Sequence, residues 1–263
     1  MDRPLPGSLY EGLFPPEKHR FLWHMSYSDR CAFHYLLQAL RPQAALEIGT
    51  DRGGSLDVLA RAAERVYSID IRTEVRERLA PHFANVEFLT GDSAVLIPQV
   101  LTQVQSQGQA LQFALVDGDH TAAGVRRDID AVLAYRPQQP MCIVMHDSFN
   151  PAVRKGICDA DWQANPQVHF VETDFSPGGL SAQTMAGDRM WGGLAVAMLL
   201  PQERAGDVQF SQSSGDLFRM TFCEFEEARL SFAARAVRKM RSLLNRAGLS
   251  FVRTTGSTAR DET

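Results

Sequence analysis

The chain has few cysteines, and they form no pattern. Four cysteines occur among the 263 residues without a Cys-x-x-Cys pair. This argues against a disulfide framework and predicts free thiols in a reducing compartment. No apolar run approaches the ~20 residues that a membrane-spanning helix needs. The first residues, MDRPLPGSLYEG, lack the apolar stretch of a signal peptide. We therefore expect a soluble, cytoplasmic protein without a transmembrane segment.

Positive charge is not in excess either. The formal net charge is −4 and the sequence pI is about 6.0. Nucleic-acid binding favours a basic surface, so we expect no nucleic acid partner. Hydrophobic residues make up 44% of the chain, which is enough to bury an ordinary globular core.

Short apolar runs alternate with amphipathic helical patterns through the middle of the chain. Strands that are apolar throughout are buried on both faces, so the alternation predicts an α/β fold with a mostly parallel sheet and helices on both faces. The last two runs are expected to close a seven-stranded sheet as an antiparallel edge hairpin. The expected strands are 44–49, 65–70, 86–91, 113–119, 141–147, 168–174 and 192–200, with helices over 56–64, 73–83, 95–104 and 122–135.

The pattern divides the chain into three parts. Residues 1–25 are rich in proline and predict an irregular N-terminal arm, while 26–201 form the α/β core and begin with a helix. Residues 202–263 are expected to form a C-terminal extension, with an amphipathic basic helix over 224–247 and a disordered tail from Thr254. That helix suits packing on its own domain or in a homo-oligomer, and a membrane surface or anionic partner is the alternative.

The turn after the first expected strand reads EIGTDRGGS from Glu47 to Ser55. Asp51 stands where a G-x-G-x-x-G dinucleotide fingerprint has its middle glycine. Carboxylates at Glu47 and Asp51 disfavour a pyrophosphate, whereas a sulfonium with an ammonium group tolerates them. The pattern E-x-G-x-x-x-G-x-S resembles motif I of class I methyltransferases that use S-adenosyl-L-methionine (SAM). The resemblance implies that SAM is bound by five residues of this turn: Glu47, Gly49, Thr50, Gly53 and Ser55.

Acidic residues also end the next two strands. Asp70 lies about twenty residues after the glycines, where a carboxylate accepts ribose hydroxyls, although a strand-end Asp also serves as a cap or turn residue. Asp92 and Ser93 follow the third strand and resemble the methyltransferase motif that contacts adenine; their alternative role is an N-cap. Together with the first turn, these residues predict SAM as the cofactor.

The fourth and fifth strands end in Asp117-Gly118-Asp119-His120 and His146-Asp147-Ser148. Converging carboxylates repel each other unless they are protonated or bridged by a cation, so a metal explains them economically. Oxygen ligands suit Mg²⁺, and a histidine ligand would make Mn²⁺ more suitable. The alternative is that Asp119 and Asp147 cap the following segments and His146 is a core histidine.

The segments VDGDHTAAGVRRDIDAVL and IVMHDS resemble the methyltransferase family 24 group over about residues 42–150. That group is related to macrolide-sugar O-methyltransferases and cephalosporin hydroxylase-like proteins, and the first turn is similar to that of catechol-type enzymes. The resemblance implies a Rossmann-like class I fold. Independently of it, the aromatic N-terminal arm is a candidate lid over the site. It also implies metal ligation by Asp117, His146 and Asp147, with Asp117 beside the cofactor and His120 as the catalytic base. His146 departs from the sugar enzymes, which have Glu or Asp there.

We therefore expect an enzyme that moves a methyl group from SAM to a hydroxyl of a small acceptor, such as a sugar or natural product, with a divalent metal. Three alternatives use the same fold. One is an NAD-dependent oxidoreductase, which the missing glycine fingerprint disfavours. A second is a non-catalytic SAM-fold protein that acts in assembly. The third is a protein similar to the cephalosporin hydroxylase-like group, which keeps the fold but catalyses a different reaction.

Overall fold

A computed structural model describes residues 21–180 and 190–221 of the chain. By contacts within the chain, it divides into two units, Met1–Phe218 and Arg219–Thr263. The expected helix over 224–247 and the tail from Thr254 lie outside the described residues, as do residues 1–20 of the expected arm. The fold and the site described below belong to the first unit.

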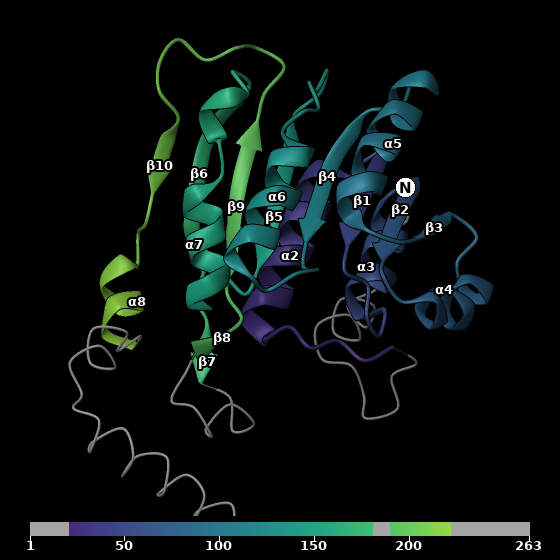
Figure 1. The fold of residues 1–263 in the computed structure, drawn as a ribbon, viewed down its shortest axis with the longest axis horizontal. Coiled ribbons are helices and arrows are strands. Elements are labelled where there is room, and N and C mark those ends of the chain that lie inside the picture. The colour runs from purple at the N-terminus through teal and green to yellow at the C-terminus, as the bar shows by residue number, and fades with distance from the viewer. Residues whose placement is uncertain (1–20, 181–189, 222–263) are drawn as a thin grey trace, which may run out of the picture. The chain divides into compact units, whose positions relative to one another are not determined.

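Eight strands form one sheet in the order β10-β6-β9-β5-β4-β1-β2-β3 (Figure 1). Neighbouring strands are parallel except for β9, which runs antiparallel to both β5 and β6. A separate antiparallel pair is formed by β7 and β8. The strands are β1 Ala44–Ile48, β2 Arg65–Asp70, β3 Val86–Thr90, β4 Leu111–Val116, β5 Met141–His146, β6 Val168–Ser176, β7 Gly179–Leu180, β8 Met190–Trp191, β9 Leu194–Leu199 and β10 Gln209–Ser211.

The expected α/β architecture is confirmed, and the two late runs form the antiparallel pair β6 and β9. The main sheet has eight strands rather than seven, because β10 adds to the edge beyond β6. β10 is three residues long, which is too short to show a period in the sequence.

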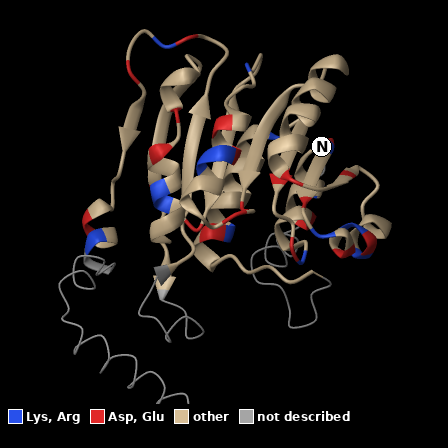
Figure 2. Ribbon diagram, in the orientation of Figure 1, with Lys and Arg blue, Asp and Glu red and all other residues tan. Residues whose placement is uncertain are grey.

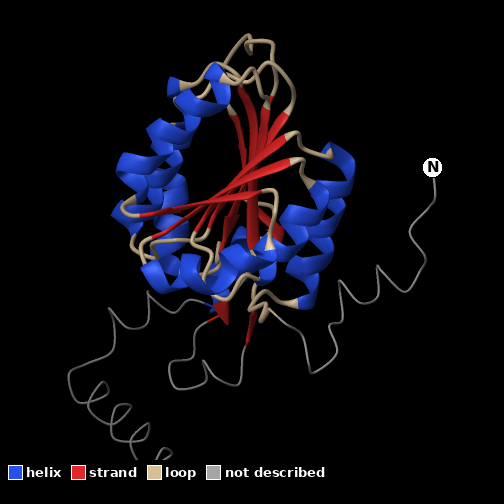
Figure 3. Cartoon of the chain, turned by 90° about the vertical axis from the view of Figure 1, so that its right-hand side faces the viewer, coloured by secondary structure: helices blue, strands red, loops and turns tan. Residues whose placement is uncertain are grey.

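Helices cover both faces of the sheet (Figure 3). Buried side chains of α5, α6 and α7 pack with one set of strand residues, and those of α2, α3 and α4 pack with the other set. Alternate residues of a strand point to opposite faces, so each central strand contributes to both cores. The helices are α2 Tyr27–Leu40, α3 Gly54–Ala62, α4 Thr73–Leu79, α5 Ser93–Ser106, α6 Ala122–Val132, α7 Pro151–Asp159 and α8 Gly215–Thr221, with 3-10 turns η1 Ala80–His82 and η2 Trp162–Ala164.

Charged residues lie mainly on the helices and loops, and the central strands β4, β5 and β9 contain no Lys, Arg, Asp or Glu (Figure 2). This distribution fits a sheet that is buried on both faces. Among the described residues, no helix is both long and apolar enough to cross a bilayer.

The helix that precedes the sheet begins with a capping box. The Ser26 hydroxyl accepts a hydrogen bond from the Asp29 backbone N–H, and the Asp29 carboxylate accepts one from the Ser26 N–H at 3.2 Å. Such reciprocal bonds satisfy N–H groups that the first turn of a helix leaves free. Ser26 is therefore the N-cap of α2.

The strand order reverses between β1 and β4, and this switch point is where a ligand can enter. β1 pairs with β2 on one side and with β4 on the other, so the connections leave in opposite directions and their loops separate at the carboxyl ends. Ile48 pairs with Val116, and Val116 pairs with Met145. The residues after these strand positions therefore lie side by side at one edge of the sheet.

Gly54 brings the N-terminal arm close to this edge. A Cβ atom on Gly54 would lie 2.4 Å from the Cα of Trp23 and 2.6 Å from the carbonyl oxygen of Leu22. The first residue of α3 is therefore glycine because the backbone of the arm crosses it. Its lack of a side chain thus accommodates the arm.

We predict that Gly54→Ala lowers the free energy of unfolding by about 1–3 kcal/mol, the usual cost of overpacking a filled site. Helix propensity alone predicts the opposite sign, because alanine favours a helix more than glycine does. Urea unfolding measures the difference. Gly206→Ala is the matched control, since no atom lies within 4 Å of a Cβ placed there. Equal stability of the two variants would contradict the proposed close approach.

Candidate functional site

A cavity of about 900 Å³ lies at the carboxyl edge of the central strands. This volume is within the range of small-molecule sites. Its wall includes residues 22–26 of the arm and the ends of strands β1 to β5. The sequence candidates that line it are Gly49, Thr50, Ser55, Asp70, Asp92, Ser93, Asp117, His120, His146 and Asp147, whereas Glu47 and Gly53 are not part of its wall.

The loop after β1 is held against the loop after β4. Gly49 has a φ of 87°, and a Cβ on it would lie 2.1 Å from the Asp117 carbonyl oxygen, so only glycine fits. Gly53 has a φ of 84° and caps α3 without a side chain. The two glycines therefore shape the turn, and the turn brings Thr50 and Ser55 to the cavity.

Glu47 lies beneath this loop and is fully buried. Its Oε1 accepts a hydrogen bond from the Ser55 hydroxyl at 2.6 Å, while Oε2 has no hydrogen-bond partner among the described residues. Burial raises the pKa of Glu47 to about 8, and the nearby carboxylates of Asp117 and Asp70 act in the same direction. Glu47 can act on a ligand through Ser55 and the loop, since its own atoms do not line the cavity.

Asp70 ties the same loop to the end of β2. Its Oδ2 accepts hydrogen bonds from the backbone N–H groups of Thr50 and Asp51, both at 3.1 Å, and its Oδ1 accepts from Arg72. Burial alone would raise the pKa of Asp70, but the bonds from Arg72 and Asp51 lower it. The Arg72 side chain is 44% exposed, so this arrangement borders solvent.

Asp92 and Ser93 start α5 at the end of β3. Asp92 accepts a hydrogen bond from the Ala94 N–H and is the N-cap, which is the alternative that sequence analysis left open. The Ser93 hydroxyl donates to Asp128 Oδ1 at 2.6 Å. Sequence analysis missed Asp128, although its position on the apolar face of the helix, between Val125 and Val132, was a signal.

Three residues at the ends of β4 and β5 form the acidic centre of the cavity. Ligand atoms of Asp117, His146 and Asp147 all lie within 4.8 Å of one another. His146 Nδ1 is 3.1 Å from Asp117 Oδ1 and 3.8 Å from Asp147 Oδ1. The three predicted metal ligands are therefore brought together. Two carboxylates and an imidazole are a donor set that fits a divalent cation of the Mg²⁺ to Mn²⁺ type.

Asp147 reaches this centre through an unusual backbone conformation. Its φ is 57°, in the left-handed region, and its carboxylate accepts a hydrogen bond from the Gly192 N–H at 2.7 Å. Aspartate tolerates this region better than most residues do. In this conformation Oδ1 of Asp147 lies 3.8 Å from His146 Nδ1.

The charge of His146 is set by the carboxylates around it. Burial alone would lower its pKa, but Asp117, Asp29 and Asp147 raise it well above the usual value. Between these groups, a protonated imidazole partly balances the negative charge. Binding a metal at Nδ1 would require loss of the proton from that atom.

His120 lies at the mouth of the centre and is 43% exposed. Its Nε2 is 2.9 Å from Asp147 Oδ2 and 3.8 Å from Asp117 Oδ1. The hydrogen bond to Asp147 raises the pKa of His120. The Trp191 ring lies 6.2 Å from the His120 ring, and both line the cavity. Phe149 and Trp162 are instead buried in the core.

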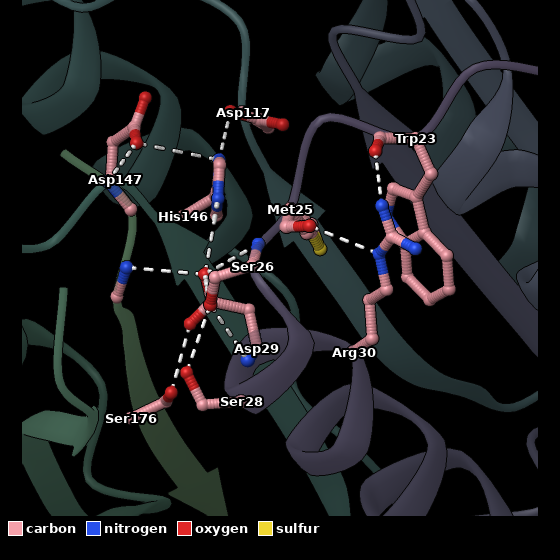
Figure 4. Close-up of polar contacts among 12 residues, drawn as sticks. Trp23, Met25, Ser26, Ser28, Asp29, Arg30, Asp117, His146, Asp147 and Ser176 are labelled. Carbon is pink, nitrogen blue, oxygen red and sulfur yellow. Dashed lines mark hydrogen bonds and ion pairs between the residues drawn. The ribbon is translucent and has the colours of Figure 1, made fainter. Parts of the chain in front are cut away.

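Sequence analysis missed one further group, Asp29 on α2. It is completely buried, and its Oδ2 lies 3.9 Å from His146 Nε2 (Figure 4). Nothing in the local sequence pointed to it, because it is also an ordinary helix-capping residue.

Residues 46–148 match the family described as "Methyltransferase domain" (Methyltransf_24). Among solved structures, an O-methyltransferase from Bacillus cereus is 15% identical, with 73% of this chain and 96% of that one covered and a TM-score of 0.48. The O-methyltransferase TomG from Streptomyces achromogenes is 18% identical, with coverage of 65% and 80% and a TM-score of 0.46. The comparison with curated proteins found no match.

We predict that the free energy of unfolding of the wild type falls relative to that of Glu47→Gln as the pH rises from about 5 to 8. The pKa of Glu47 is raised to about 8 in the folded chain from an ordinary value of 4.5. Between these two pKa values, the folded chain keeps a proton that the unfolded chain has lost. The stability that depends on this proton is complete below the unfolded pKa and is lost as the pH rises to the folded pKa. The relative change is on the order of a few kcal/mol.

Chemical denaturation at a series of pH values measures this difference. The exposed Glu64 provides the control, and Glu64→Gln is expected to follow the wild type. Parallel pH profiles for the wild type and Glu47→Gln would show that Glu47 is ionised in the folded protein.

Proposed function

Residues 46–148 carry a methyltransferase domain, and from this premise we propose that the protein is a SAM-dependent O-methyltransferase that uses a divalent metal. The acceptor that we propose is a hydroxyl of a sugar or another small natural product. One observation carries the proposal: the ends of β1, β2 and β3 line the same cavity as the cluster of Asp117, His146 and Asp147.

The cofactor part of the proposal rests on the β1 to β3 side of the cavity. Gly49 and Thr50 offer backbone at the wall, Asp70 lies at the end of β2, and Ser93 lies at the end of β3. Ligands of open α/β sheets bind at this edge, next to the switch in strand order. Bound SAM supplies an electrophilic methyl group on a cationic sulfur, which the surrounding carboxylates favour.

The remaining chemistry falls to residues at the ends of β4 and β5. Asp117, His146 and Asp147 would hold the metal, which when bound lowers the pKa of a coordinated hydroxyl and orients it. His120 receives the acceptor proton, and the hydrogen bond that its Nε2–H donates to Asp147, with Asp117 nearby, stabilises the resulting imidazolium. Trp191 provides an apolar face beside this group for the acceptor.

The decisive experiment is binding of S-adenosylhomocysteine and Mn²⁺ to the purified chain, by calorimetry and by anomalous scattering from soaked crystals. We expect both to bind, with Mn²⁺ density in contact with Asp117 and Asp147. Asp117→Asn is expected to weaken Mn²⁺ binding at least tenfold, because it removes a charged ligand, and Asp119→Asn serves as a nearby acidic control. Binding of NAD instead of S-adenosylhomocysteine would contradict the proposal.

His120 is tested separately with an acceptor found by screening sugars and phenols with labelled SAM. His120→Ala is expected to lower kcat by roughly 10²-fold or more, the usual contribution of a general base, with little change in S-adenosylhomocysteine affinity. Unchanged turnover would remove His120 from the mechanism. A parallel loss of Mn²⁺ affinity would make it a ligand instead of a base.

A further inference from the structure

Asp29 approaches His146 from the side opposite to Asp117 (Figure 4). It lies in the first turn of α2, nearly ninety residues before Asp117, and its side chain has no exposed surface. Figure 4 shows it on the far side of the His146 ring from Asp117. Oδ2 of Asp29 faces Nε2 of His146 at 3.9 Å, while Nδ1 faces Asp117 at 3.1 Å. The ring is thus placed between two carboxylates.

The position of Asp29 is fixed by more than its helix. Ser26 donates to Oδ2 from its hydroxyl at 2.7 Å, Ser176 donates to Oδ1 at 2.8 Å, and the Gly193 N–H donates to Oδ2 at 3.3 Å. These partners come from the α2 cap, the end of β6 and the turn before β9. The capping box needs only the two backbone N–H bonds between Ser26 and Asp29, so these three bonds are additional and fix the carboxylate beside His146.

His146 Nε2 is buried and has no hydrogen-bond partner within normal distance among the described residues. A buried polar nitrogen without a partner costs free energy, so the facing carboxylate has a physical consequence. A proton on Nε2 is stabilised by Asp29, which leaves the lone pair of the neutral ring on Nδ1. Nδ1 is the nitrogen next to Asp117 and Asp147.

We propose that Asp29 is a positioning residue for the metal centre: it holds His146 with the proton on Nε2, so that Nδ1 is the metal-binding atom. This inference rests on the proposed function, because it requires the metal. Carboxylates that accept the second N–H of a ligating histidine typically change metal affinity by 10–100-fold. Asp29 would act through His146 and would not touch the metal, SAM or the acceptor.

The test compares Mn²⁺ affinity, measured by electron paramagnetic resonance, among the wild type, Asp29→Asn and Ser176→Ala. Asp29→Asn is expected to bind Mn²⁺ 10–100-fold more weakly, because the amide cannot stabilise the Nε2 proton as a carboxylate does. Ser176→Ala removes an anchor of Asp29 but keeps the charge, and we expect a change of less than about threefold. Equal affinity of the wild type and Asp29→Asn would overturn the inference.

A double-mutant cycle separates positioning from a structural role. If Asp29 acts through His146, Asp29→Asn costs little further Mn²⁺ affinity in a His146→Gln background. Equal losses in both backgrounds, with a lower Tm and weaker S-adenosylhomocysteine binding, would make Asp29 structural and overturn the inference. Absence of Mn²⁺ binding to the wild type would refute the metal part of the proposed function itself.

A measurement on the wild type keeps the inference testable if Asp29→Asn does not fold. Ring-nitrogen NMR of the Zn²⁺-loaded protein, with His146→Gln used for assignment, reports which nitrogen carries the proton. We expect a protonated Nε2 and a metal-bound Nδ1. The reverse assignment would show that Asp29 does not determine the orientation of the ligand.

Discussion

The parallel register of β1, β4 and β5 is the constraint on which the site depends. Ile48, Val116 and Met145 are paired across the three strands, so the next residue on each strand, Gly49, Asp117 and His146, reaches the same edge. Gly49 lets the first two loops touch, because any side chain there would overlap the Asp117 carbonyl. Backbone pairing therefore brings these residues to one edge of the sheet, whatever rotamers their side chains adopt.

Several carboxylates at one edge of the sheet repel one another, and two features of the structure reduce this repulsion. Beneath the β1 loop, burial keeps Glu47 protonated over most of the physiological range, so it adds little negative charge. At the centre, His146 and His120 each lie beside carboxylates that favour the imidazolium form. A divalent cation can replace this positive charge, so the same arrangement suits both a metal-free and a metal-bound state.

The surroundings of the centre join distant parts of the chain. Asp29 comes from α2, Gly192 comes from the turn after β8, and Trp23 comes from the arm that crosses Gly54. The sheet edge provides the reactive groups, while these segments fix their orientation and enclose them. A rigid scaffold with a site completed by loops is the usual arrangement in α/β proteins.

The sequence by itself determined the seven longer strands, helices α2 to α6, the parallel sheet and the acidic strand ends, because apolar runs and strand-end residues are local patterns. Helix α7 was not among the expected helices. It also predicted that Asp117, His146 and Asp147 come together, since parallel strands bring their carboxyl ends to one edge. Only the tertiary structure decided that Asp92 caps α5, that β10 extends the sheet and that Glu47 lies behind the cavity wall. The role of Asp29 depends on contacts between segments far apart in the chain, and such contacts leave no periodicity in a single sequence.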